Sequence, residues 1–232
     1  MNKFSKMFVP GALAIPDKLK VTQSFKIGHK MEHPEECILS CYRCGQVENQ
    51  GSLPWCAAYS ASSYAENILW RKRGWPEQID PAPLYAHAKY IDGNPSGDGT
   101  SLECVLDALL EKKYFTRGVS TVKTFGGGWF GSDPDEALEK LKMTIFRYGS
   151  CIIGCNIDSS WYTPKNGVIT GGGSPLGGHA VTPTAYTKEG VVILNSWGSD
   201  WGHDGEAFIP NKLLKEIFIY GACLTNVWNG MS

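Results

Sequence analysis

The chain has 232 residues, of which 42% are hydrophobic and 19% are charged, a balance typical of folded proteins rather than disordered ones. The formal net charge is −1 and no run of Lys or Arg forms a basic stripe, so we expect no nucleic-acid partner. No apolar run reaches the roughly 18–20 residues of a membrane-spanning helix, so we expect no membrane partner either.

The first residues, MNKFSKMFVPGALA, loosely imitate an export signal, with a basic start, a short apolar stretch and an Ala-x-Ala triplet. Pro10 and Gly11 interrupt that apolar stretch, so we interpret the segment as a structured N-terminal arm. The chain has eight cysteines, an even number that permits a disulfide framework. Without a convincing export signal, we expect reduced thiols and a cytoplasmic location.

Three helices are predicted from their caps and apolar spacing. The first runs from about Cys56 to about Arg73, the second begins at Thr100, and the third begins at Asp133. Thr100 and Glu103 have the pattern of a capping box. One face of the first helix carries small or apolar residues that suit close packing, namely Ala58, Ser62, Ala65 and Leu69.

Short apolar runs bounded by Gly, Asn and Asp follow the third helix and indicate strands. They cover residues 150–157, 179–187, 190–197, 205–210 and 217–225. The segment Lys188–Gly190 is a predicted hairpin turn between two of them. Helices before about residue 120 and strands after it predict an α+β fold with a helical lobe and a sheet lobe.

Cys56 begins the first predicted helix, where the partial positive charge of the helix N-terminus favours a thiolate. A thiolate is a strong nucleophile, whereas a protonated thiol is a weak one. The segment VENQGSLPWCAAYSASSYAE therefore has two interpretations: Cys56 is an ordinary buried thiol, or it is an activated nucleophile.

An activated thiol needs a base, and the base needs a group that orients it. Among five histidines, His179 follows two glycines and is predicted at the first position of a strand. Hairpin pairing with the next strand brings Asn195 close to His179, and an Asn carbonyl can accept the ring N–H of a His. Trp197 follows immediately and could shield that hydrogen bond from water.

Three segments, NQGSLPWCAAYS, GGHAV and LNSWGSDWGHDG, resemble the signature segments of the papain-like cysteine peptidases, in the order of that family. His179 follows Cys56 by 123 residues and Asn195 follows it by 139, against the roughly 130–150 typical of the family, so the fit is close but slightly compact. Three segments in the right order and spacing are a far stronger signal than any one of them.

The resemblance implies roles for individual residues. Cys56 matches the nucleophile, His179 the general acid/base and Asn195 the residue that orients it. Gln50 matches the side-chain donor of the oxyanion hole, with the backbone N–H of Cys56 as the second donor. The resemblance also implies substrate-binding positions at Gly99, Gly178 and Trp197.

The resemblance further implies a single peptidase domain over residues 1–232 with the papain-like two-lobed fold. An arm covers about 1–48, a helical lobe about 49–120, and a mainly β lobe, antiparallel and barrel-like, about 121–232. The active site would lie in the cleft between the lobes. We expect a cysteine-type endopeptidase that acts on a peptide or protein substrate, with no cofactor, and the sequence does not indicate the oligomeric state.

The chain departs from the family pattern beside the nucleophile. Leu53 replaces a cysteine that forms a disulfide in the family, Trp55 replaces a small residue, and Ala57 replaces a Trp. Subsite preferences therefore cannot be carried over. Two other functions use the same residues or the same fold: acyl transfer or amide hydrolysis on a substrate other than a peptide, and a catalytically silent binding protein.

A second cysteine cluster, His33, Cys37, Cys41 and Cys44, has gaps that are compatible with metal binding. It lacks a second C-x2-C pair, so we interpret these cysteines as ordinary thiols and expect no metal site.

The apolar segment before about Asp17 contains two prolines and favours an extended backbone. It could cover the cleft near Cys56 and Gly99, or it could pack across the back of the lobes.

Overall fold

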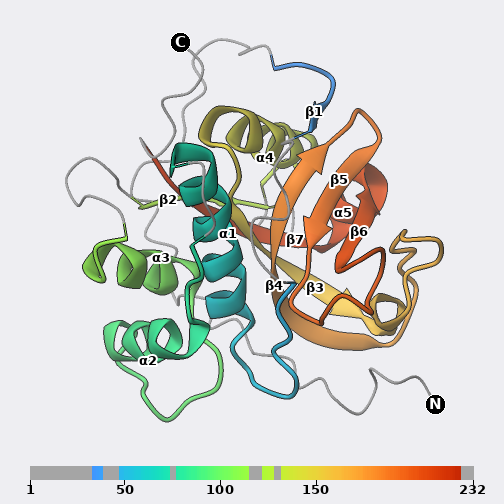
Figure 1. Cartoon of the computed structure of the whole chain (residues 1–232). Helices are drawn as coiled ribbons and strands as arrows, with labels where there is room; N and C mark the ends of the chain where they lie inside the picture. Colours follow the sequence, from blue (N-terminus) through green and yellow to red (C-terminus); the bar gives the residue numbers. More distant parts are fainter. Residues whose placement is uncertain (1–32, 39–46, 74–76, 115–121, 128–131, 226–232) are drawn as a thin grey trace.

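The computed structural model describes residues 33–38, 47–73, 77–114, 122–127 and 132–225, which form a helical lobe beside a sheet lobe (Figure 1). The helices are α1 (Cys56–Arg73), α2 (Pro81–Ile91), α3 (Leu102–Glu111), α4 (Pro134–Tyr148) and α5 (Asn211–Ile217), with the short 3-10 helix η3 (Ser159–Tyr162). The strands are β1 (Cys37–Ile38), β2 (Val122–Gly126), β3 (Ile152–Asp158), β4 (Pro175–Tyr186), β5 (Gly190–Leu194), β6 (Glu206–Pro210) and β7 (Phe218–Leu224). The α+β prediction is confirmed.

The strands form one antiparallel sheet in the order β2-β7-β3-β4-β5-β6, with β1 added to β4. Strand β4 is the longest, and it pairs with β3 along its first part and with β5 along its second part. The predicted hairpin is present, since the Thr187 N–H donates to the Gly190 carbonyl at 2.9 Å. This hairpin sets the β4–β5 register, in which Thr182 lies opposite Leu194.

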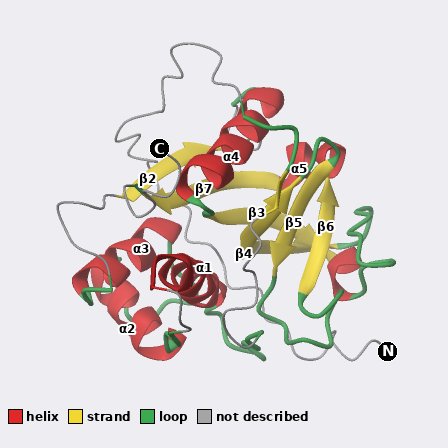
Figure 2. Cartoon of the chain, turned by 45° about the horizontal axis from the view of Figure 1, so that its top comes forward, coloured by secondary structure: helices red, strands yellow, loops and turns green. Residues whose placement is uncertain are grey.

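The sheet separates two hydrophobic cores among the described residues because successive strand residues face opposite sides. On β3, Ile152 packs into the core of α1–α3, whereas Ile153 and Cys155 pack into the core that α4 shares with the other face of the sheet. Figure 2 shows α1–α3 together on one side and α4 and α5 on the other. The continuous apolar run on β3 is thus explained by burial of both faces.

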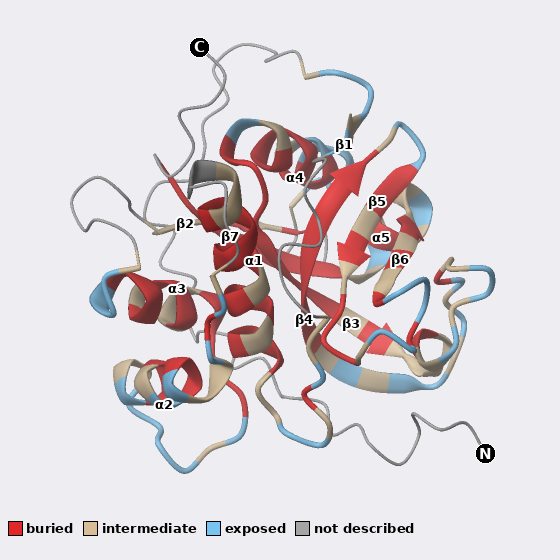
Figure 3. Ribbon diagram, in the orientation of Figure 1, coloured by how far each residue is buried: buried red, intermediate tan, exposed pale blue. Residues whose placement is uncertain are grey.

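Helix α1 has the predicted bounds, and the predicted small-residue face is fully buried (Figure 3). Small side chains let α1 approach the sheet closely, so that Ser60 Oγ lies 2.9 Å from Thr182 Oγ1 on β4. This contact fixes the helix that begins with Cys56 against the strand that carries His179.

The start of α4 follows the predicted cap, but the start of α3 does not. Asp133 Oδ1 accepts the Glu136 N–H at 2.9 Å, as expected. On α3 the cap is Ser101, whose hydroxyl accepts the Cys104 N–H at 3.2 Å. The prediction of Thr100 was wrong by one residue because the Thr100 hydroxyl donates to Asp92 at 2.8 Å instead.

Helices α2 and α5 and strand β2 were not predicted. Pro81 and Pro83 in the first turn of α2 obscured it, although a proline is well tolerated there. Asp80 caps the helix by accepting the Ala82 N–H at 2.9 Å. Helix α2 matters for the site because its buried Tyr85 stacks on Trp55, the residue before α1.

Candidate active site

Cys56 is the first residue of α1, and only 2% of its surface is exposed. The backbone N–H of Ala180, the residue after His179, is directed at the Cys56 sulfur. The fold therefore brings the start of α1 and the middle of β4 together. Cys56 is buried because small residues of α1 pack closely on the sheet.

His179 lies in the middle of β4 rather than at the start of a strand, and it is fully buried. The prediction missed the first residues of β4, whose glycines conceal the strand pattern. Asn195 follows β5, and its Oδ1 lies 2.8 Å from His179 Nε2. Oδ1 also accepts the Ser196 N–H at 2.9 Å, which fixes the amide orientation. The His179 Nε2–H therefore donates to Asn195, and Nδ1 is the basic nitrogen of the neutral ring.

Aromatic rings surround His179. The Trp197 ring lies 5.0 Å from the imidazole in a tilted arrangement, and the Trp161 ring meets it edge-on at 6.2 Å. Trp201 packs edge-on against Trp197 at 5.7 Å and donates its indole N–H to the Trp161 carbonyl at 2.6 Å. This enclosure excludes water, and the resulting desolvation lowers the pKa of His179 to about 4, although the hydrogen bond that His179 donates to Asn195 acts in the opposite direction.

Burial also raises the pKa of the Cys56 thiol to about 11, although the N–H groups of Ala180 and Ala57 act in the opposite direction. Desolvation of both groups favours a neutral thiol and a neutral imidazole. A thiolate–imidazolium pair requires that the attraction between the two charges, together with the helix N-terminus, exceed that desolvation. The two groups therefore titrate as a coupled pair rather than independently.

Gln50 is 1% exposed and is fixed by three contacts. Its backbone N–H donates to the Ser196 carbonyl at 2.9 Å, and its Oε1 accepts the Ser196 hydroxyl at 2.6 Å. Its Nε2 donates to the Leu53 carbonyl at 2.8 Å. Because an amide nitrogen carries two hydrogens, one N–H of Gln50 is available to a further acceptor.

Gly99 is buried, with a φ of 69° that favours glycine. Its carbonyl accepts the buried Lys89 Nζ at 2.9 Å, and Lys89 also donates to Asp92 at 2.8 Å. The Gly99 N–H faces the Tyr85 hydroxyl. The backbone polar groups of this glycine are thus engaged by the protein. Of the other two predicted substrate positions, Gly178 lies half-buried on β4, and Trp197 is buried against His179.

Sequence reasoning missed the stacked aromatic pair of Trp55 and Tyr85. Their rings stack with centroids 4.9 Å apart and planes inclined by 22°, next to Cys56. It also missed the half-buried Glu48 and the buried Lys89, two ionisable residues near the predicted site. An ionisable residue on the packing face of a predicted helix is a signal that can be read from the sequence. Only Lys89 would have given that signal, and only if α2 had been predicted.

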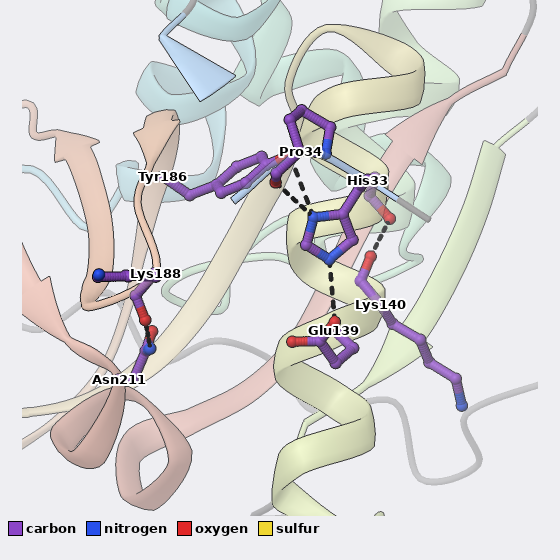
Figure 4. A network of polar contacts seen from close by, with 8 residues as sticks. His33, Pro34, Glu139, Lys140, Tyr186, Lys188 and Asn211 are labelled. Carbon is purple, nitrogen blue, oxygen red and sulfur yellow. Dashed lines mark hydrogen bonds and ion pairs between the residues drawn. The ribbon is translucent and has the colours of Figure 1, made fainter. Parts of the chain in front are cut away.

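Half of the second cysteine cluster lies outside the described residues, which include His33 and Cys37 but neither Cys41 nor Cys44. His33 Nε2 contacts Glu139 Oε2 at 2.9 Å, and its Nδ1 lies 3.3 Å from the Tyr186 hydroxyl (Figure 4). Across the described ranges, no three His, Cys, Asp or Glu side chains are grouped to hold a metal ion. In the same ranges, no helix is long and apolar enough to cross a membrane.

The chain is similar in sequence to cathepsin B-like cysteine proteinase 6 of Caenorhabditis elegans, with 27% identity over 136 residues. That match spans 56% of this chain and only 35% of the relative. No family model matches the chain.

Solved structures resemble the whole fold. Xylellain, a cysteine protease of Xylella fastidiosa, aligns with a TM-score of 0.68 and 17% identity, covering 94% of this chain and 97% of that one. Procathepsin L 3 of Tenebrio molitor aligns with a TM-score of 0.66 and 15% identity, covering 96% and 80%. The chain therefore has the papain-like fold, as the resemblance in sequence implied.

Proposed function

We propose that this chain is a cysteine peptidase in which Cys56 is the nucleophile and His179 the general acid/base. The observation that carries the proposal is the 2.8 Å contact between His179 Nε2 and Asn195 Oδ1, beside a cysteine that begins a helix. The two-lobed chain would act as one domain, on a peptide or protein substrate. The likeness to xylellain and to cathepsin-type proteins supports the assignment.

In the first step, His179 Nδ1 takes the thiol proton and the Cys56 sulfur attacks the carbonyl carbon of the peptide bond. A C–S bond forms, and the electron pair of the C=O bond moves to oxygen. The bond from Nε2–H to Asn195 supports this role, because it leaves Nδ1 as the proton acceptor and stabilises the imidazolium that forms.

The oxyanion needs hydrogen-bond donors that are already in position. We assign this role to the Cys56 backbone N–H and to the N–H of Gln50 that does not donate to Leu53. The contacts of Gln50 with Ser196 support the assignment, since they fix its side chain before substrate arrives.

The intermediate collapses when His179 donates its proton to the leaving amine and the C–N bond breaks. A thioester between Cys56 and the acyl part of the substrate remains. Water then attacks this thioester while His179 removes a proton, which releases the carboxylic acid and regenerates the thiol. An endopeptidase would perform this cycle within a peptide chain.

Covalent titration with an epoxide or vinyl sulfone, followed by mass spectrometry, tests the nucleophile. We expect a single label on Cys56 that is absent from Cys56→Ala and retained in Cys104→Ala, which changes a half-buried cysteine on α3. A label that persists in Cys56→Ala, or no label on the parent, contradicts the proposal. Incubation with a mixed peptide library then distinguishes peptide hydrolysis from acyl transfer or from action on other amides.

A cytoplasmic location remains a proposal. It is supported by the six described cysteines, which form no disulfide with one another, namely Cys37, Cys56, Cys104, Cys151, Cys155 and Cys223. Reduced thiols are typical of the cytosol, whereas secreted proteins usually pair them.

A further inference from the structure

Glu48 lies in the segment that joins the two sides of the proposed site. Its backbone carbonyl accepts the Gly198 N–H at 2.9 Å, and two residues later Gln50 N–H donates to the Ser196 carbonyl at 2.9 Å. The segment 48–50 therefore runs antiparallel to the residues that follow Asn195.

The side chain of Glu48 reaches the opposite side, where it contacts α1. Its Oε2 lies 2.9 Å from Ser62 Oγ, and Ser62 is fully buried less than two turns after Cys56. One residue thus links the helix that carries Cys56 to the loop that carries Asn195.

The hydrogens at this contact can be counted. Ser62 Oγ lies 2.9 Å from Glu48 Oε2 and 3.0 Å from the Tyr59 carbonyl oxygen. A hydroxyl has one hydrogen, and a carbonyl oxygen can only accept. If Glu48 is a carboxylic acid, it donates to Ser62 and Ser62 donates to Tyr59, so both contacts are hydrogen bonds. If Glu48 is a carboxylate, a single hydrogen must serve two acceptors.

The surroundings of Glu48 also favour the protonated carboxylic acid. Burial raises the pKa of this carboxyl to about 8; the contact with Ser62 opposes the shift, and the carboxylates of Glu66 and Asp80 add to it. The titratable groups that face it are Tyr59 and Glu66 on α1 and Asp80 before α2. On the sheet side its backbone carbonyl accepts the neutral Gly198 N–H. Within the part of the chain that the structure describes, the charged side chains that act on Glu48 are therefore carboxylates.

We propose that Glu48 is a positioning residue for the site: as a carboxylic acid it joins α1 to the loop after Asn195, and its ionisation at alkaline pH weakens this link. The link acts on catalysis through the relative position of Cys56 and His179, and Glu48 itself touches no substrate. The catalytic part of this inference rests on the proposed function, whereas the link between the two sides is a structural property.

The pH dependence of peptide hydrolysis tests the catalytic part, using the full chain and a fluorogenic peptide. Glu48→Ala should lower kcat about tenfold near pH 6.5, and Glu48→Gln, whose amide can donate as the acid does, should largely restore it. The ratio of kcat/KM for Glu48→Gln over the parent should rise about fivefold between about pH 6.5 and about pH 9.5. The exposed control Glu136→Gln should keep a constant ratio. A constant ratio for Glu48→Gln, or parental kcat for Glu48→Ala, overturns the inference.

Urea unfolding of the same variants provides a test that needs no activity. The unfolding midpoint of the parent should fall relative to that of Glu48→Gln as the pH rises over the same range. If the two proteins show the same pH dependence of unfolding, the inference fails even where hydrolysis is normal. If no protein hydrolyses the peptide but the midpoints diverge as expected, the proposed function fails and the ionisable link stands.

Discussion

The sheet lobe and the helical side of the site bury different kinds of polar group. The sheet lobe supplies His179, which is paired with the neutral amide of Asn195 and enclosed by aromatic rings such as Trp197. The helical side supplies carboxyls, Glu48 and Glu66, which contact a hydroxyl and a backbone N–H rather than cations. Both sides bury these groups, but burial lowers the pKa of the histidine and raises the pKa values of the carboxyls.

Desolvation favours the neutral form of every buried ionisable group. It lowers the pKa of His179 to about 4, and it raises the pKa values of Glu66 and Glu48 to about 7 and about 8. Acidic conditions therefore charge the sheet side, and mildly alkaline conditions charge the helical side. We therefore expect the packing around α1 to respond more to pH near neutrality than the sheet side does.

The largest expected effect comes from the variant Cys56→Ala, because Cys56 is the only residue to which we assign a covalent bond with the substrate. Hydrolysis of a fluorogenic peptide should fall to the uncatalysed background, because no other group replaces the thiolate. Removal of one buried sulfur should cost about 1 kcal/mol of unfolding free energy. Measurable turnover by purified Cys56→Ala that contains no parent protein would exclude Cys56 as the nucleophile.

The next effect separates the two residues of the sheet lobe. His179→Ala should reduce kcat about 10³-fold through loss of the general acid/base. Asn195→Ala should reduce it less, about tenfold to a hundredfold, because Asn195 only orients the ring. Steady-state kinetics of both variants give the ranking, and the reverse order would show that another group orients His179.

The elements that the sequence predicted best are those whose signals are local. Helix α1, the cap at Asp133 and the hairpin before Gly190 depend on neighbouring residues, and all three are present. The contact between His179 and Asn195 was predictable because the hairpin brings the residue after β5 back beside β4, even though a bulge between Pro183 and Ala185 shifts the register.

The features that were missed depend on contacts between distant segments. Thr100 was a reasonable cap until Asp92 engaged its hydroxyl, and the burial of Cys56 depends on how closely α1 packs on the sheet. The shifted pKa of Glu48 has no local signal at all, because it arises from burial and from carboxylates that the fold brings near. Such effects require tertiary structure.

Lys89→Met should have a smaller effect on activity but a clear effect on stability. Lys89 joins Asp92 to the Gly99 carbonyl while only 4% exposed, and methionine retains most of the apolar stem. Asp92 keeps its bonds from the Asn94 N–H and the Thr100 hydroxyl, so we expect a loss of about 2 kcal/mol in unfolding free energy. Urea denaturation measures this loss.

Lys89→Arg is the matched control, because it retains the charge and should recover part of that stability. If the Gly99 loop also contributes to substrate binding, Lys89→Met should raise KM more than it lowers kcat. Equal stability of Lys89→Met and the parent would show that the ion pair contributes nothing net.

The most gradual effect is the pH dependence of stability, which compares the two lobes directly. Above its ordinary value of 4.5 and up to about 7 for Glu66 and about 8 for Glu48, each folded carboxyl keeps a proton that the unfolded chain releases. The folded state then binds more protons, so each group lowers stability by at most about 1.4 kcal/mol per pH unit as the pH rises. His179 acts oppositely between about 4 and its ordinary value of 6.5, because only the unfolded chain is protonated there. Stability should therefore fall most steeply above about pH 6.5, where the imidazole no longer offsets the carboxyls.

Urea denaturation from about pH 5 to about pH 9 should show this decrease, and Glu66→Gln should reduce it while Glu136→Gln should not. Stability that rises between about pH 6.5 and about pH 8 would contradict the assignment of neutral carboxyls to the helical side.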